Sequence, residues 1–199
     1  MKILSGKPSD YSKGKIRPAR WLAAVALLAA MIGGGAWGFA GVFDHASFAG
    51  GLVLSAVLCG GMVAVLTILD LKRLPGFVIS VLVWVSVVTW GIHLAQERAV
   101  AEVARFVRNK PSLAARWGAL PDDQIWPLFL VENGLDAKGP DPGSYMRLRA
   151  AQGIQVEGLG HRRREVRGFW LYTEWMYLVL VAGLGTIAPV FIIASLEDE

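Results

Sequence analysis

The chain has little charge and a single cysteine. Charged residues make up 18% of its 199 residues and hydrophobic residues 54%, whereas a soluble domain of this size carries charge on about a quarter of its residues. This composition argues against a soluble globular domain. Because Cys59 is the only cysteine, an intramolecular disulfide is excluded. We interpret Cys59 as a small packing residue within an apolar segment.

Motifs that carry chemistry are also lacking. The glycines at 33–35 and 60–61 lie inside apolar runs, without the sequence context of a phosphate-binding loop. His45, His93 and His161 do not have the spacing of zinc ligands, and the chain contains no CxxC pair. The short basic clusters adjoin apolar runs, so phospholipid headgroups are their nearest anions, rather than nucleic acid. We therefore expect no catalytic residue, no metal, no cofactor and no nucleic-acid partner.

What the sequence does contain is long apolar runs. A helix needs about 20 apolar residues to cross the hydrocarbon layer of a bilayer. Four segments meet this length, at 21–43, 46–69, 74–95 and 169–196. They predict an all-α integral membrane protein with four transmembrane helices and a small helical extramembrane region, 96–168, between the third and the fourth. No internal repeat and no strand-rich stretch occurs.

The distribution of Lys and Arg predicts the orientation. The tail 1–20 carries six Lys and Arg residues against one acid, Asp10, and the turn after the second span contains Lys72-Arg73. Basic segments that flank membrane spans stay in the cytoplasm. We therefore expect both termini, including the acidic tail 197–199, to be cytoplasmic, with 96–168 outside, in a bacterial inner membrane. Because the region 96–168 is longer than the ~60 residues over which loop charge steers orientation, its own Lys and Arg residues do not change this prediction.

The extramembrane region is expected to be helical. Residues 96–109 continue the amphipathic pattern beyond the third span. Asp122 is expected to cap a helix over 124–133, and Asp141 a helix from Pro142 to Gln152.

Four large apolar residues of this region are more than we expect a unit of about 70 residues to bury. We therefore predict an exposed docking surface for other proteins, formed by Trp117, Trp126, Phe129 and Leu130.

Small residues recur at four-residue spacing in the first two spans. Such ridges let helix backbones approach closely. We predict that they pack the two spans as a hairpin, through Gly34, Gly38, Ala56, Gly60 and Ala64. In the fourth span, Pro189 predicts a bend.

Charges beside the fourth span have two interpretations. They can bind lipid headgroups, or they can form ion pairs; these residues are Arg162, Arg163, Arg164, Arg167 and Glu174. Glu174 is expected to pair with Arg167, to pair with a partner protein, or to reach water at the interface.

From these features we expect a non-catalytic polytopic subunit that packs in and docks to a larger membrane protein assembly. Its partners would be other membrane subunits and the lipid bilayer, with no small-molecule substrate identified. A secretion or conjugation apparatus is favoured over a respiratory or photosynthetic complex. The first alternative is a small transporter or channel component, with Ser80, Ser86, Thr89 and Glu174 around one cavity. The second is a membrane enzyme that uses Glu174 with His93 or His161.

Overall fold

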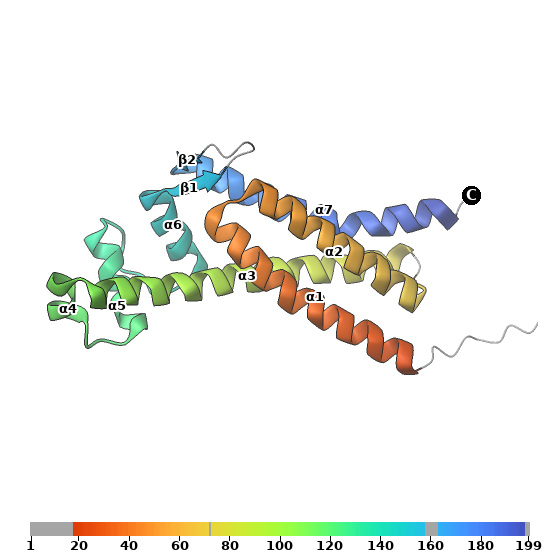
Figure 1. The fold of residues 1–199 in the computed structure, drawn as a ribbon, viewed down its shortest axis with the longest axis horizontal. Coiled ribbons are helices and arrows are strands. Elements are labelled where there is room, and N and C mark those ends of the chain that lie inside the picture. The colour runs from red at the N-terminus through yellow and green to blue at the C-terminus, as the bar shows by residue number, and fades with distance from the viewer. Residues whose placement is uncertain (1–17, 72, 158–162, 198–199) are drawn as a thin grey trace, which may run out of the picture.

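Four long helices form the body of the protein. The computed structural model describes residues 18–71, 73–157 and 163–197, and Figure 1 shows its fold. The long helices are α1 (Pro18–His45), α2 (Phe48–Leu69), α3 (Arg73–Asn109) and α7 (Phe169–Glu197). Each is long and apolar enough to cross a membrane. The predicted fold class is confirmed: the chain is an integral membrane protein of four spans.

The four spans form a bundle in which each helix has two main neighbours. The contacts place α1 between α2 and α3, and α7 on the opposite side between the same two helices. Two indole N–H groups join spans directly: Trp84 of α3 donates to the carbonyl of Val179 at 3.0 Å, and Trp175 of α7 donates to that of Phe43 at 2.9 Å. The beginning of α1 and the end of α7 lie at the same end of the bundle (Figure 1).

Short turns with defined caps connect the first three spans. Ser47 accepts a hydrogen bond from the backbone N–H of Gly50 at 3.1 Å and so caps α2. At the other end of α2, Asp70 adopts a left-handed conformation with φ of 50°, which stops the helix. These turns explain why the chain reverses direction within a few residues.

Close helix contacts occur at glycines, but mostly not at the predicted ones. A Cβ atom on Gly185 of α7 would lie 2.4 Å from the carbonyl oxygen of Ser55 on α2. A Cβ atom on Gly61 of α2 would lie 2.6 Å from the sulfur of Met31 on α1. At Gly91 of α3 the nearest atom would be a ring carbon of Phe39, at 2.7 Å.

The predicted hairpin ridge is therefore wrong at three of its five positions. Gly34, Ala56 and Gly60 are exposed on the outside of the bundle, and a side chain at either glycine would meet open space. Gly38 does approach Leu54, at 3.3 Å from a Cβ atom, and Ala64 is half-buried. A four-residue repeat selects one face of a helix, but it does not say which neighbour that face meets.

Beyond the spans, α3 continues as one helix to Asn109, which confirms the predicted helical continuation. Three short helices follow: α4 (Pro111–Trp117), α5 (Asp122–Glu132) and α6 (Pro142–Gln152). The predicted cap of α6 is confirmed, since the Asp141 carboxylate accepts from the N–H of Ser144 at 2.9 Å. The predicted cap of α5 is wrong, because Asp122 lies inside the helix and pairs with Arg108.

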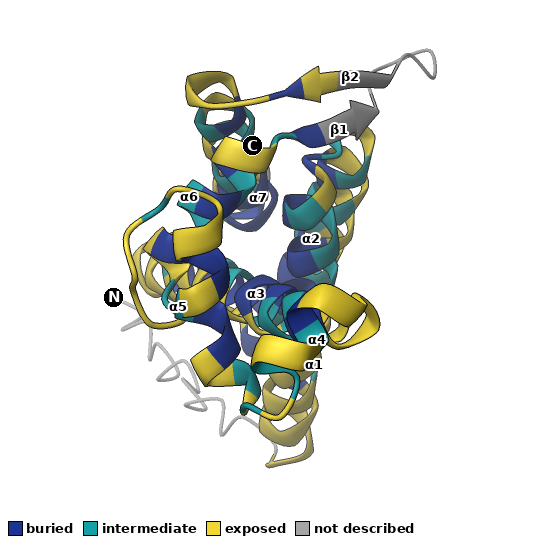
Figure 2. Cartoon of the chain, turned by 90° about the vertical axis from the view of Figure 1, so that its left-hand side faces the viewer, coloured by how far each residue is buried: buried dark blue, intermediate teal, exposed yellow. Residues whose placement is uncertain are grey.

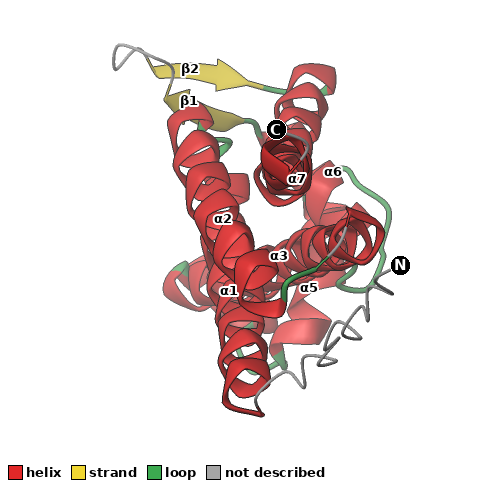
Figure 3. Cartoon of the chain, turned by 90° about the vertical axis from the view of Figure 1, so that its right-hand side faces the viewer, coloured by secondary structure: helices red, strands yellow, loops and turns green. Residues whose placement is uncertain are grey.

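Two short strands were not predicted. The strands β1 (Ile154–Glu157) and β2 (Arg163–Val166) pair antiparallel, with Ile154 opposite Val166. Figure 3 shows them at the edge of the molecule, beyond the helices. Ile154 and Val166 are buried, so the hairpin closes one side of the extramembrane region. Gly153 and Gly168, both with positive φ, flank the pair.

Candidate functional site

The extramembrane helices have a core of their own. Trp126 of α5 is 0% exposed, and its indole N–H donates to the hydroxyl of Ser144 on α6 at 3.1 Å. Phe129 and Leu130 are buried beside it, and Trp117 is half-buried. Figure 2 shows the buried residues of α5 and α6 on the sides that face the rest of the molecule.

Because these residues are buried, the predicted docking surface is wrong. Trp126, Phe129 and Leu130 cannot present an exposed patch, because they fill the contact between α5, α6 and α3. As an isolated unit, the extramembrane region would leave these side chains uncovered. In the structure the projecting part of α3 supplies the missing wall, so the short helices bury their large side chains against it.

A polar cluster joins this region to the membrane spans. The hydroxyl of Tyr145 donates to Asp44 at 2.7 Å, and the guanidinium of Arg149 donates to the same carboxylate oxygen at 3.0 Å. Arg149 also lies 3.3 Å from a carboxylate oxygen of Glu102 on α3. The side chain of Asp44, at the end of α1, is only 10% exposed. We name Asp44, Glu102, Tyr145 and Arg149 the outer clamp.

The outer clamp perturbs two of its own groups. Burial raises the pKa of the Tyr145 hydroxyl well above its ordinary value, and the adjacent negative charge of Asp44 raises it further. Burial acts to lower the pKa of Arg149, but Asp44, Tyr145 and Glu102 together raise it above its ordinary value. Both residues therefore keep their protons. The cluster therefore consists of the neutral phenol of Tyr145 and the cationic guanidinium of Arg149, both bound to the carboxylate of Asp44.

Aromatic rings continue the clamp into the bundle. The ring of Phe43 stacks on that of Trp175, with centroids 4.9 Å apart, and the ring of Tyr145 lies 6.3 Å from that of Phe43. Each of these three side chains is buried. The stack and the outer clamp hold α6 in a fixed position on the ends of α1 and α7.

A groove runs along the outer surface of the membrane span of α3. Its volume is about 460 Å³, and it is lined by Ile32 of α1 and by Val85, Ser86, Thr89, Trp90 and His93 of α3. We name it the α3 groove. Ser86 is half-buried, while Thr89 and His93 are exposed. Thr89 lies about 24 Å along the helix from Arg73, at about 1.5 Å per residue. It is therefore still within the ~30 Å hydrocarbon layer.

The hydroxyls of the α3 groove differ from that of Thr67 on α2. Thr67 on α2 donates to the carbonyl of Val63 at 2.8 Å, and so satisfies its hydroxyl within its own helix. Within the described part of the chain, Ser86 and Thr89 make no such hydrogen bond. One turn after Thr89, His93 lies 3.3 Å from Glu97 on the same helix. The groove thus has two hydroxyls within the hydrocarbon layer, Ser86 and Thr89, and an imidazole at the boundary of the layer.

Arg167 does not form the predicted ion pair with Glu174. Arg167 donates instead to Glu165, two residues away, at 2.7 Å. Glu174 is half-buried near the beginning of α7. Arg162 and the side chains of Arg163 and Arg164 lie outside the described residues.

The residues named for the two alternative functions do not share one site. Ser86 and Thr89 line the α3 groove, but Ser80 and Glu174 do not. Ser80 is fully buried in the bundle. The acid that His93 contacts is Glu97, not Glu174. His161 lies outside the described residues.

A metal centre is not supported by the arrangement of possible ligands. Among the residues that the structure describes, no three His, Cys, Asp or Glu side chains come together. Cys59 is half-buried in α2. Compared with protein-family models, with curated proteins and with solved structures, the chain finds no match.

Proposed function

We propose that this protein is a non-catalytic subunit of a larger membrane protein assembly, and that the α3 groove receives a transmembrane helix of a partner subunit. The observation that carries the proposal is the position of Ser86, Thr89 and His93. All three line a groove on the outside of the bundle. By helix length from Arg73, Ser86 and Thr89 lie within the hydrocarbon layer, and His93 lies at its boundary.

Polar groups in a membrane span normally face other protein segments. Hydrocarbon chains cannot hydrogen-bond, so Ser, Thr and His side chains in spans bond across helix contacts. An acyl chain could fill the volume of the α3 groove, but it would leave the hydroxyls of Ser86 and Thr89 without a partner. A transmembrane helix with polar or small residues would fill the groove and also form hydrogen bonds with the two hydroxyls.

The packing of α3 within the chain supports the same proposal. In the most apolar window of α3, 22% of the residues are buried inside the structure, compared with 50% in α7. The membrane part of α3 is thus the least covered of the four spans. A partner helix seated in the α3 groove would bury this face.

The extramembrane region has a different part in the proposed assembly. Its large apolar residues are already buried, and the outer clamp fixes it to the spans. We therefore assign partner binding to the membrane span of α3 rather than to the outer helices.

For the orientation and location, we propose that both termini are cytoplasmic and that the membrane is a bacterial inner membrane. The support is the basic tail 1–20 and the Lys72-Arg73 turn. A secretion or conjugation apparatus is the class of assembly that we expect.

Co-purification from native membranes in mild detergent tests the proposed function. The double variant Ser86→Ala, Thr89→Val removes both hydroxyls and keeps similar volumes. Because interhelical hydrogen bonds of this kind contribute about 1 kcal/mol each, we expect at least a fivefold loss of co-purified partners. The matched control is Thr67→Val, since that hydroxyl bonds within its own helix. Full recovery of every partner with the double variant would contradict the proposal.

A further inference from the structure

A hollow lies beside the beginning of α7, where the chain passes from strand β2 into the fourth span. Its volume is about 260 Å³, and it is lined by Glu165, Val166, Arg167 and Trp170. Val166 is buried, whereas the other three residues are exposed. Because side chains alternate along an extended segment, Glu165 and Arg167 lie on the same side and form the polar part of the hollow. We name it the α7 hollow.

The α7 hollow lies at the boundary of the membrane span. Phe169, the first residue of α7, is 77% exposed, and Trp170 is 70% exposed. Their rings meet edge to face, with centroids 6.2 Å apart. Exposed Trp side chains at the end of a span are typical of the level of the lipid headgroups. A ligand in the hollow would therefore meet the hydrocarbon layer on one side and charged side chains on the other.

The polar part of the α7 hollow holds one cation and one anion. Nε of Arg167 donates to Oε1 of Glu165 at 2.7 Å, and Nη2 of Arg167 contacts the same oxygen. In the described part of the chain, neither side chain has another hydrogen-bond or ion-pair partner. Oε2 of Glu165 can therefore accept a hydrogen bond from a ligand, and Nη1 of Arg167 can donate one. An ion pair as exposed as this contributes little stability, so it can rearrange around a ligand.

Gly153 fixes the position of the Arg167 side chain. A Cβ atom on Gly153 would lie 2.6 Å from Cγ and 2.9 Å from Nε of Arg167. The φ of Gly153 is 80°, a conformation that glycine adopts readily. The stem of Arg167 therefore lies directly on the backbone before β1, and this contact keeps its guanidinium beside Glu165.

We propose that the α7 hollow binds phosphatidylethanolamine, with its ammonium on Glu165, its phosphate on Arg167 and its acyl chains beside Trp170. The headgroup carries one positive and one negative charge, joined by an ethyl link, and the hollow presents one acid and one guanidinium. A guanidinium matches phosphate in charge and geometry, and a primary ammonium has N–H groups to donate to the carboxylate.

The carboxylate of Glu165 is the group that selects this headgroup. Phosphatidylcholine carries the same phosphate and the same net charge, but its quaternary ammonium has no N–H to donate. Phosphatidylglycerol has no ammonium at all. The preference of the hollow for a primary ammonium is therefore the property that distinguishes the proposal from general attraction of lipid phosphates to arginine.

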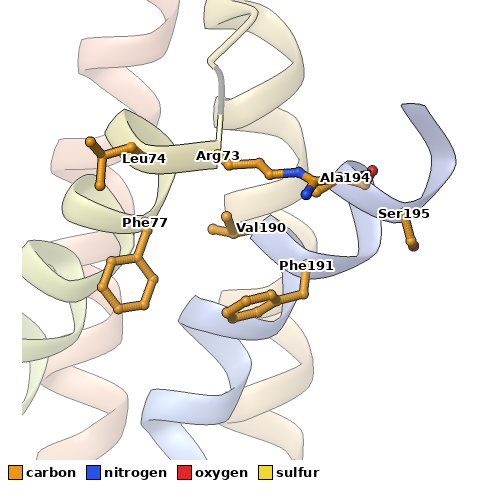
Figure 4. A pocket seen from close by; sticks show the side chains of 7 residues that line it. All are labelled: Arg73, Leu74, Phe77, Val190, Phe191, Ala194 and Ser195. Carbon is orange, nitrogen blue, oxygen red and sulfur yellow. Dashed lines mark hydrogen bonds between the residues drawn. The ribbon is translucent and has the colours of Figure 1, made fainter. Parts of the chain in front are cut away.

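The groove at the other end of α7 differs in this respect. It lies between the first turns of α3 and the last turns of α7, and Figure 4 shows its apolar walls, formed by Leu74, Phe77, Val190 and Phe191. None of the described residues that line it is an acid. We therefore expect no preference for a primary ammonium from that groove.

Native mass spectrometry of the purified full chain tests the lipid proposal. The protein is equilibrated with equal amounts of phosphatidylethanolamine and phosphatidylcholine that carry the same acyl chains. We expect about threefold more phosphatidylethanolamine on the wild-type protein, which is the size of effect that an exposed ion pair gives. Equal retention, or more phosphatidylcholine, would overturn the proposal without any variant. An excess of water-soluble glycerophosphoethanolamine should leave the lipid bound, and displacement by it would contradict the assignment to a lipid.

Two pairs of matched variants locate the site. Glu165→Gln should bring the two lipids to parity, whereas Glu97→Gln should keep the preference. Glu97 is 60% exposed and is likewise paired with a near neighbour, His93. Trp170→Ala should reduce retention of phosphatidylethanolamine, whereas Trp37→Ala, at a residue that is 68% exposed on α1, should not. The proposal is wrong if the preference survives in Glu165→Gln or disappears in Glu97→Gln, or if the two Trp variants retain the lipid equally.

Discussion

Tyr145 and Asp44, which are far apart in the sequence, share a hydrogen bond of 2.7 Å that joins α6 to the end of α1. Arg149, one turn further along α6, donates to the same carboxylate. Asp44 is thus a point at which α6 is fixed to the membrane spans. The structural consequences of this arrangement can be measured directly.

Replacing Asp44 with Asn should loosen α6 from the bundle. The change removes the charge that faces Arg149 and leaves it with Glu102, a more exposed acid. Breaking a partly buried ion pair in this way costs about 2 kcal/mol. Hydrogen exchange should therefore become faster in residues 142–152, while the four spans keep their protection. Asp123→Asn, an exposed acid of α5, is the control; equal exchange in the two variants would refute the role of Asp44.

Stability should depend on pH through Tyr145 at high pH. The pKa of Tyr145 is raised in the folded protein by burial and by Asp44, whereas in the unfolded chain it is about 10. The stabilisation is therefore fully present below pH ~10 and is lost as the pH rises further, because only the unfolded chain ionises readily. Tyr145→Phe should be less stable by about 1 kcal/mol at neutral pH.

The comparison of the two proteins across pH is the informative measurement. Thermal unfolding in detergent between neutral pH and the strongly alkaline range should show the difference between wild type and Tyr145→Phe shrinking above pH ~10. A constant difference over the whole range would show that the hydroxyl of Tyr145 titrates alike in the folded and unfolded protein.

Gly185 is the contact between spans that should tolerate a side chain least. A Cβ atom there would meet the backbone of Ser55, which cannot move aside as a flexible side chain can. Gly185→Leu should therefore destabilise the bundle by ~2 kcal/mol or more. Gly60→Leu is the matched control, because Gly60 faces open space on α2. Thermal aggregation of the two variants in one detergent checks this; equal midpoints would contradict the observed packing of α7 on α2.

The orientation of the protein can be tested by labelling single cysteines in intact cells. In a Cys59→Ala background, we expect a membrane-impermeant thiol reagent to label Ser112→Cys, in the exposed first turn of α4, but not Ser9→Cys. The physical reason is the basic tail 1–20, which favours the cytoplasmic side. Labelling at position 9 without labelling at 112 would reverse the orientation.

The membrane spans could be predicted from the sequence because their signal is local. Twenty uncharged apolar residues in a row are long enough to cross the bilayer as a helix, and an ordinary core helix rarely contains such a run. The capping of α6 by Asp141 could be predicted for the same reason, since the Asp-Pro pair and the terminal Gly153 lie next to the helix that they bound.

Contacts between distant segments could not be predicted in this way. The sequence predicts an exposed Trp126, because nothing near it in the chain indicates that Ser144 and α3 cover it. Asp44 lies in what reads as a short loop, although its partners lie on α6. The strands β1 and β2 have four residues each, which is too short for a periodic pattern to stand out.

The α3 groove could be predicted only in part. The transporter alternative requires Ser86 and Thr89 to share one cavity with Ser80 and Glu174, but the sequence does not say which face of a span meets its own bundle. The rotation of α3 decides it: Ser80 points inward and is buried, while Ser86 and Thr89 lie on the outer groove. This rotation is the reason that a partner helix, rather than an internal pathway, is the proposed role of these residues.

Site-specific photo-crosslinking in native membranes tests this central proposal most directly. A photoreactive amino acid at position 89, in the α3 groove, should give a crosslink to a membrane protein of a different sequence, identified by mass spectrometry. The same amino acid at Val57, an exposed lipid-facing position of α2, should give no protein crosslink. Crosslinks at position 89 to lipid alone, or only to a second copy of this chain, would contradict the assignment of the α3 groove as the seat of a partner subunit.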